Sequence, residues 1–245
     1  IQKQGIMEVL DVQRSAVSKE WPELESVWER PKQIEEKLDN LEKAIAFLKG
    51  YRKEKGGIAA ALAPKTVIEQ NKFSNVVAGP EADNKLRECL LIEKKIENST
   101  AEVENITGRI QHLLPWENLK TPLEEIEKLE NASVLAGFLS EKNLAEAEAK
   151  LADTAIFRTV SRNNSTIAFY AVCLNENTQE VHKFLRNLEF ESVTFAGLDG
   201  TAEDLIRQYR RKLEAVEKEL AAAHNQANTY IDSLLDLEIL ADYYR

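Results

Sequence analysis

The feature that most constrains the fold is a pair of long segments in which apolar residues recur alternately three and four positions apart. The first covers residues 80–114 and the second covers 201–245, and no glycine or proline interrupts the second. This spacing places apolar side chains on a narrow stripe of an α-helix, which is typical of a coiled coil. At about 1.5 Å per residue, the two helices would be roughly 50 and 65 Å long.

The two stripes predict an antiparallel helix pair. Neither stripe is wide enough for a globular core, and the chain between the helices must fold back, so we expect the stripes to pack on each other. Thr201, three residues before Asp204, suits the N-cap of the returning helix. The predicted seam comprises Ile96, Val103, Ile106, Ile110, Leu213, Val216 and Leu220.

The outgoing helix is predicted to end at "HLLPWENL", residues 112–119. Pro115 cannot continue a helix, because it lacks a backbone N–H and its ring clashes with the preceding turn. Trp116 is one of only three tryptophans in the chain, so a bulky side chain arrives where the helix stops. We therefore expect Leu114, Pro115 and Trp116 to anchor the helix to the domain that follows.

The segment between the two helices has strand and helix patterns of its own. Asn163 and Asn164 tolerate the backbone of a tight turn and favour a hairpin there, and Ser140 suits a helix cap. The predicted order is β-α-β-β-α-β, a ferredoxin-like arrangement. The expected strands cover 132–139, 154–161, 165–174 and 190–195, and the expected helices cover 140–151 and 177–188.

The first eighty residues predict a smaller unit. Residues 6–12 read as a strand, and the apolar residues between Ile34 and Leu48 form another helical stripe. The fold class expected is α+β: an antiparallel two-helix coiled-coil stalk that carries a ferredoxin-like distal lobe and a partial α/β proximal lobe. The expected divisions are 1–31 (part of the proximal lobe), 32–79 (helix and connector), 80–114 (outgoing helix), 115–200 (distal lobe) and 201–245 (returning helix).

Charge and residue types argue against several classes of function. The formal net charge of −10 disfavours nucleic acid as a partner, because like charges repel. The three histidines lie in different predicted elements, which gives no metal-ligand spacing. "GLDG" (197–200) opens a helix, where phosphate can bind, but three carboxylates in and just after it oppose an anion. We expect no catalytic residue, metal or cofactor, and we expect Cys89 and Cys173 to be buried thiols.

Several stretches resemble a known family. "QKQGIMEVLDVQ", "FLKGYRKEKGG", "LLPWENL" and "LLDLEILADYYR" look like the cytoplasmic half of subunit I of prokaryotic V/A-type rotary ATPases, similar to subunit a of eukaryotic V-ATPases. The resemblance follows the order of segments over essentially the whole chain. It implies two α/β lobes joined by a coiled coil, and a non-catalytic stator at the cytoplasmic face of the membrane.

The resemblance also implies partners. Peripheral-stalk heterodimers of subunits E and G would bind the lobes, alongside other subunits of a proton- or sodium-translocating complex that hydrolyses or synthesises ATP. A C-terminal membrane domain would follow Arg245 and would supply the channel arginine, which therefore has no position here. The family's first strand and helix would precede Ile1.

A second interpretation stays open from the residues themselves. The chain could be a free-standing cytosolic regulator, in which the ferredoxin-like head senses a small ligand and the coil dimerises. This head architecture serves many functions, so the fold does not choose between the two. Such a dimer would have twice the mass of the 27.8 kDa chain. A hydrolase or transferase lacks a supporting set of residues.

Overall fold

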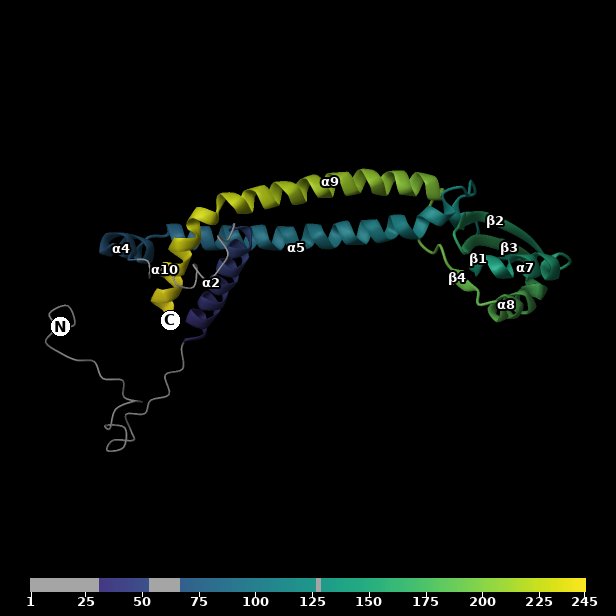
Figure 1. Ribbon diagram of the computed structural model, residues 1–245, viewed down its shortest axis with the longest axis horizontal. Coiled ribbons are helices and arrows are strands. Elements are labelled where there is room, and N and C mark those ends of the chain that lie inside the picture. Colours follow the sequence, from purple (N-terminus) through teal and green to yellow (C-terminus); the bar gives the residue numbers. More distant parts are fainter. Residues whose placement is uncertain (1–30, 53–66, 127–128) are drawn as a thin grey trace, which may run out of the picture. The chain divides into compact units, whose positions relative to one another are not determined.

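The computed structural model describes residues 31–52, 67–126 and 129–245. Within these residues the protein is an α+β molecule that combines long helices with a four-stranded sheet (Figure 1). It divides into two compact units, one formed by the residues up to Leu90 together with Thr229–Arg245, the other by Leu91–Asn228. The strand expected at 6–12 and the lobe expected over 1–31 lie outside the described residues.

The first unit is helical where it is described. It contains α2 (Lys32–Tyr51), α4 (Gln70–Ala78), the start of α5 (Glu81–Leu113), the 3-10 turn η6 (Ile231–Ser233) and α10 (Leu234–Tyr244). The apolar stripe of α2 packs against α5 and α10, which buries it away from water. The buried cluster consists of Leu38, Leu41, Ala44, Ile45, Leu48, Ala82, Leu86, Cys89, Leu234, Leu237, Leu240 and Ala241.

Half-buried polar contacts connect the same helices. The Lys37 ammonium on α2 lies 2.8 Å from an Asp83 carboxylate oxygen on α5 and donates to the Tyr244 hydroxyl on α10 over 2.9 Å. Burial alone would lower the pKa of Lys37, but the hydrogen bonds to Asp83 and Tyr244 outweigh it and raise that pKa above its usual value. Lys85 pairs with Asp236 at 2.8 Å and connects α5 to α10 a second time.

The returning helix is not continuous, contrary to the expectation of one helix over 201–245. Helix α9 (Ala202–Thr229) ends first, and η6 separates it from α10. The apolar pattern explains the break, because Leu237, Ile239, Leu240 and Ala241 are all buried and point to nearly every side of α10. A helix that is apolar on most sides is buried in a bundle and cannot continue a narrow seam.

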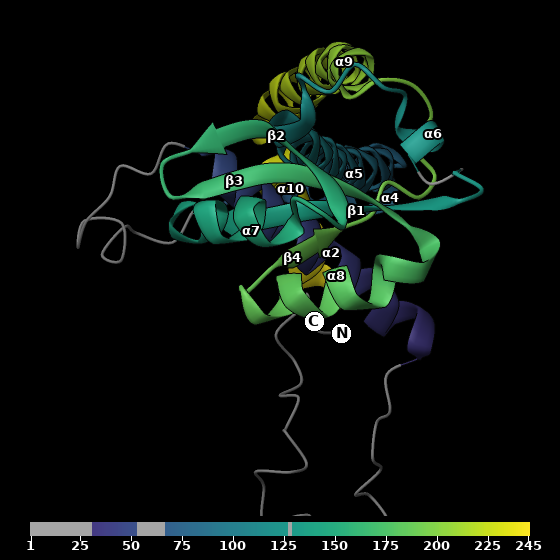
Figure 2. The same cartoon turned by 90° about the vertical axis from the view of Figure 1, so that its right-hand side faces the viewer.

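In the second unit, α5 and α9 run antiparallel and side by side (Figures 1 and 2). The chain passes from α5 through the 3-10 turn η3 (Leu114–Trp116) and the short helix α6 (Leu123–Ile126) into the sheet, and it returns through α9. Thr201 caps α9, because its Oγ1 accepts a hydrogen bond from the Asp204 N–H at 3.2 Å.

The remaining elements of this unit form a lobe. They are β1 (Ala132–Ser140), η4 (Glu141–Asn143), α7 (Leu144–Leu151), β2 (Ala155–Asn163), β3 (Thr166–Leu174), η5 (Asn175–Asn177), α8 (Thr178–Asn187) and β4 (Glu191–Val193). The strand order is β2-β3-β1-β4, and every pair of neighbours is antiparallel. Asn164 takes φ of 50° in the turn between β2 and β3. Ser140, expected to cap a helix, makes no such hydrogen bond, because η4 comes before α7.

The two faces of the sheet are covered by different parts of the chain. Helices α7 and α8 cover one face, as Figure 2 shows. That core contains Leu139, Leu144, Ala147, Leu151, Ile167, Phe169, Ala171, Cys173, Val181, Leu185 and Leu188. The opposite face receives η3 and the ends of α5 and α9, so the two long helices are joined to the lobe through its second face.

Candidate functional site at the junction of the long helices and the sheet

Trp116 lies at the centre of this junction. Its side chain is fully buried, and its ring centroid lies 5.0 Å from that of Phe195 and 5.8 Å from that of Phe138 on β1. The surrounding buried cluster draws on both long helices and the sheet: Ile106, Ile110, Leu113, Trp116, Leu119, Leu123, Ala136, Ala168, Phe195, Ala202, Leu205, Ile206 and Val216. Of the predicted anchor residues, Leu114 is half-buried against this cluster, and Pro115 lies within η3.

The Trp116 indole carries a polar atom that the cluster does not satisfy. Its Nε1 is buried and has no hydrogen-bond partner among the residues that the structure describes. A buried donor without a partner costs about 1–3 kcal/mol. Apolar packing around the rings therefore holds this side chain in place, and its polar tip opposes that packing.

Polar contacts close the junction on either side of Trp116. Ser161 on β2 donates through Oγ to the Pro115 carbonyl over 2.7 Å. The Leu123 N–H donates to the Gly200 carbonyl over 2.9 Å, which places the chain entering the lobe beside the chain leaving it. Both passages between helix pair and lobe are therefore fixed by backbone groups.

The "GLDG" turn is occupied by the protein's own carboxylate. Gly200, with φ of 99°, donates its N–H to Glu124 Oε2 over 2.7 Å. Gly197 also has a positive φ, 77°, which favours glycine at both positions. An anion does sit on this backbone N–H, but it comes from α6, so the turn serves the junction instead of offering that amide to a phosphate.

Five of the seven predicted seam residues pack in the cluster that α5 and α9 share. Ile106, Ile110 and Val216 are buried, and Val103 and Leu213 pack half-buried against the same cluster. Ile96 and Leu220 are half-buried.

Polar pairs flank the seam. Lys212 pairs with Glu102 at 2.7 Å, and Arg109 donates to the Tyr209 hydroxyl over 3.2 Å. Each of these contacts crosses from one helix to the other, so the helices are linked outside the apolar stripe as well as within it.

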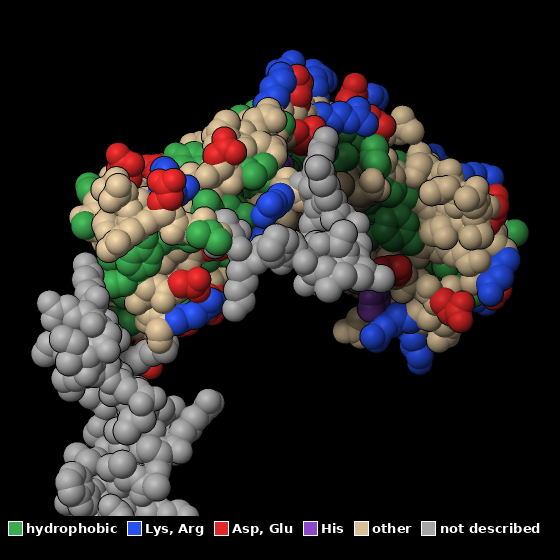
Figure 3. All heavy atoms as spheres, turned by 60° about the vertical axis from the view of Figure 1, so that its left-hand side comes forward, with side chains coloured by type: hydrophobic (Ala, Val, Ile, Leu, Met, Phe, Trp, Pro, Cys, Tyr) green, Lys and Arg blue, Asp and Glu red, His purple; other side chains and the backbone are tan. Residues whose placement is uncertain are grey.

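Charge at the junction is locally paired. Lys120 contacts Glu203 at 2.7 Å, and this hydrogen bond raises the pKa of Lys120 and lowers that of Glu203. Because both side chains are well exposed, water and salt screen the pair, and it adds little to stability. Figure 3 shows side chains of both charge signs along the outer surface of α9, at the top of the view.

Side chains that could bind a metal ion do not cluster in the described part of the chain. The described residues contain no group of three or more His, Cys, Asp and Glu side chains that could hold a metal ion. His112, His182 and His224 lie on α5, α8 and α9.

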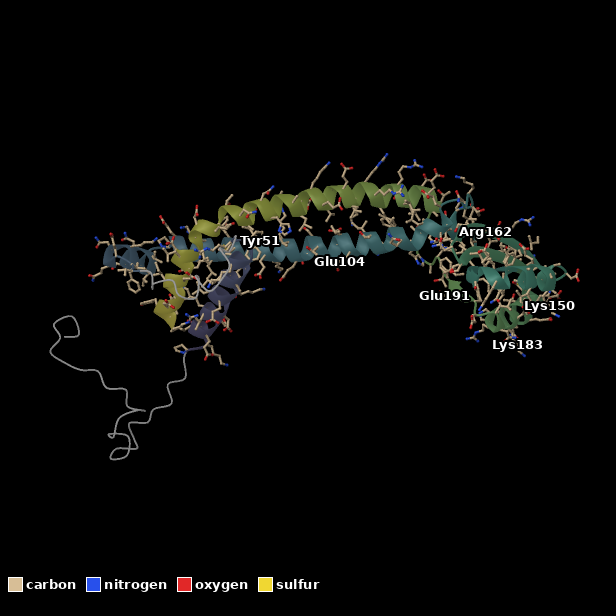
Figure 4. All side chains as sticks on the ribbon, viewed as in Figure 1. Tyr51, Glu104, Lys150, Arg162, Lys183 and Glu191 are labelled. Carbon is tan, nitrogen blue, oxygen red and sulfur yellow. The ribbon has the colours of Figure 1, made fainter. Side chains whose placement is uncertain are left out.

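Two charged side chains of the lobe share a hollow, because Lys150 on α7 and Lys183 on α8 both line a space of about 220 Å³. The labelled Lys150, Arg162, Lys183 and Glu191 lie on four different elements (Figure 4). A hollow of about 370 Å³ beside α5 is lined by Arg109, His112 and Tyr209 among others, and Arg109 already bonds to its neighbours there.

Sequence reasoning missed the partners of Trp116. Phe138 and Ala136 alternate on one face of β1, and that alternation was the available signal. It shows that β1 has an apolar second face, although it does not say what covers that face. Phe195 lies at the end of the strand expected over 190–195, but β4 covers only Glu191–Val193 and Phe195 follows it in an irregular segment.

Comparison with solved structures finds a likeness in fold, whereas the sequence comparisons find no match. No protein-family model matches the sequence, and no curated protein matches it. Among solved structures, the chain is similar to the "cytoplasmic N-terminal domain of subunit I, homolog of subunit a, of V-ATPase". The alignment covers 95% of this chain and 81% of that chain, with a TM-score of 0.49 and 13% identity. A likeness of this degree assigns no function to this chain. No helix among the described residues is long and apolar enough to cross a bilayer.

Proposed function

We propose that this protein is a non-catalytic stator part of a proton- or sodium-translocating rotary V-type ATPase. In this role it links peripheral stalks, formed by subunits E and G, to a membrane ion channel, at the cytoplasmic face of the membrane. The starting point is the resemblance of its segments, in order, to the cytoplasmic half of subunit I. The chain itself would contribute no catalytic residue and no cofactor.

One observation carries the proposal beyond the resemblance. The apolar seam of α5 packs against α9 of the same chain, and α5 ends and α9 begins in the cluster around Trp116. Two helices joined along a seam resist bending much better than a flexible linker does. A stator must transmit force between its partners without rotating, and such a helix pair has the required stiffness.

The same observation bears on the regulator interpretation. A coil that dimerises needs an apolar stripe that faces a second chain, whereas Ile106 and Ile110 already pack with Val216 of their own chain. The stator proposal therefore expects a mass of 27.8 kDa in light scattering, and the regulator expects twice that value.

The direct test is calorimetric titration of the whole chain with the purified E–G heterodimer, at near-physiological salt so that weak surface charge contacts are screened. We expect saturable binding. If the heterodimer does not bind, the stator role is refuted, and a mass of twice the monomer's would then favour the regulator.

A further inference from the structure

Part of the sheet face that receives Trp116 is only partly covered by the described residues, since Val134 and Val172 are half-buried there and Ile156 is exposed. Ile156 on β2 lies opposite Val172 on β3, and Val172 lies opposite Val134 on β1. Residues directly opposite one another point to the same face, so the three side chains form one row across three strands. The cluster around Trp116 includes Ala136 and Ala168 from neighbouring rows on the same face. It includes none of the three side chains of this row.

The row belongs to a larger apolar area. Ile156, Leu174 and Leu129 are 60%, 54% and 46% exposed, although each is a large apolar side chain. A hollow of about 220 Å³ adjoins the row and is lined by Leu119, Thr121, Glu125, Ile126, Leu129, Val134, Tyr170 and Val172. Single exposed apolar residues are ordinary, but several on one face mark a binding surface. We call Leu129, Val134, Ile156, Val172 and Leu174 the sheet surface.

The geometry of the sheet surface suits a helix. Neighbouring strands lie about 4.8 Å apart, so the row of three side chains is roughly 10 Å long. Helix positions i, i+3 or i+4, and i+7 advance by about 5 Å each, so a helix that lies across the strands would place one apolar side chain over each of them.

An added β-strand fits less well at the β2 edge of this surface. There the pairing of β2 with β3 shifts register between Thr159 and Ser161. Ser161 is tied to Pro115, and the Arg158 guanidinium folds onto the Phe157 carbonyl, its own neighbour, over 3.2 Å. Bulges and charged side chains of this kind protect an edge against further pairing.

Charged side chains at the two ends of the row indicate which charges the bound helix should carry. Arg158 lies beside Ile156 at the β2 end, and Glu125 lines the hollow at the other end. Neither side chain makes an ion pair with another described residue. A helix with an acidic residue near Arg158 and a basic residue near Glu125 would complement both.

We propose that the sheet surface binds an amphipathic helix of a partner protein, with an acidic residue at one end of its apolar stripe and a basic residue at the other. The inference rests on the proposed function, in which that partner is the peripheral-stalk heterodimer. It adds where the heterodimer docks on the lobe and which chemistry recognises it.

The test titrates the purified E–G heterodimer into the full chain and into two variants. Ile156→Thr with Leu174→Thr places threonine, which has a high β-propensity, at both exposed strand positions and removes apolar area. Leu91→Gln is the matched control, because Leu91 is 62% exposed on α5, away from the sheet. We expect the double variant to bind about tenfold more weakly, as substitutions at the centre of an interface do. The control should bind like the natural chain.

A charge variant supplies an independent measurement. Arg158→Glu should also weaken binding and make the affinity less sensitive to salt, since one attraction becomes a repulsion. Circular dichroism and urea midpoints equal to those of the natural chain would show that the variants fold.

The outcomes separate this inference from the proposed function. If the natural chain binds and the double variant binds equally well, the sheet surface is not the docking site, and the stator role stands. If the natural chain does not bind, both proposals fail. A doubled mass that the double variant abolishes would identify a second copy as the occupant and overturn the assignment to a partner helix.

Discussion

Replacing Trp116 tests whether the junction is held by apolar packing. Trp116→Ala would remove a fully buried side chain from between Phe138 and Phe195 and leave a cavity, and such truncations cost about 3–5 kcal/mol. Trp116→Phe would keep one aromatic ring and remove the buried Nε1, whose missing hydrogen bond costs about 1–3 kcal/mol. The loss of buried volume destabilises the fold, and the removal of the unpaired N–H stabilises it. We therefore expect Trp116→Phe to lower the free energy of unfolding by less than about 1.5 kcal/mol.

Urea unfolding followed by circular dichroism measures these changes, and amide hydrogen exchange of β1 and β3 locates them in the lobe. Phe73→Ala, at a 40% exposed aromatic of α4 in the other unit, is the control and should cost less than about 1 kcal/mol. The reasoning is refuted if Trp116→Ala costs no more than the control. It is also refuted if Trp116→Phe is as damaging as Trp116→Ala, because the indole N–H would then contribute favourably.

Three further predictions concern single positions. Gly108 lies inside α5, and an added Cβ would meet open space, so Gly108→Ala should raise the free energy of unfolding by about 0.5–1 kcal/mol. Gly197 has a positive φ of 77°, so Gly197→Ala should lower the free energy of unfolding in the same urea assay. Gly137→Ala should separate β4 from β1, because its Cβ would collide with the Glu191 carbonyl, and faster amide exchange confined to that pair would show this. The Glu203 carboxyl should titrate below its usual pKa by NMR and return toward it in Lys120→Gln. Because the pKa of Glu203 is lowered in the folded state, the small stabilisation by this pair is present above the unfolded pKa and is lost as pH falls through the folded pKa. An unchanged Glu203 titration in Lys120→Gln would contradict the assignment of the shift to Lys120.

Much of the secondary structure follows from local periodicity. The three-and-four spacing predicts a helix over 80–114, and α5 spans Glu81–Leu113. The alternation and the turn at Asn163–Asn164 predict a hairpin, and β2 and β3 pair there. Periodicity is sufficient in these cases because each pattern is long and is interrupted only at its ends.

The break after Thr229 was not predictable in the same way. No helix-breaking residue marks it, and the apolar stripe continues past Tyr230 in the sequence. Only the bundle formed by α2, α5 and α10 decides that Leu240 and Ala241 are buried as well, and that contact is tertiary. The ring contacts of Trp116 depend in the same way on residues distant in the chain, so one sequence supplies the tryptophan but not its neighbours.

The hydrogen bond between the Leu123 N–H and the Gly200 carbonyl has a consequence for the evolution of this fold. It holds the entry to the lobe next to the exit, and Lys120 and Glu203 face each other at the same place. The whole lobe is thus an insertion between α5 and α9, and the two ends of the insertion lie next to each other. Another domain could therefore replace the lobe without changing the register between α5 and α9. The only requirement is that the two ends of the inserted domain lie as close together as Leu123 and Gly200 do.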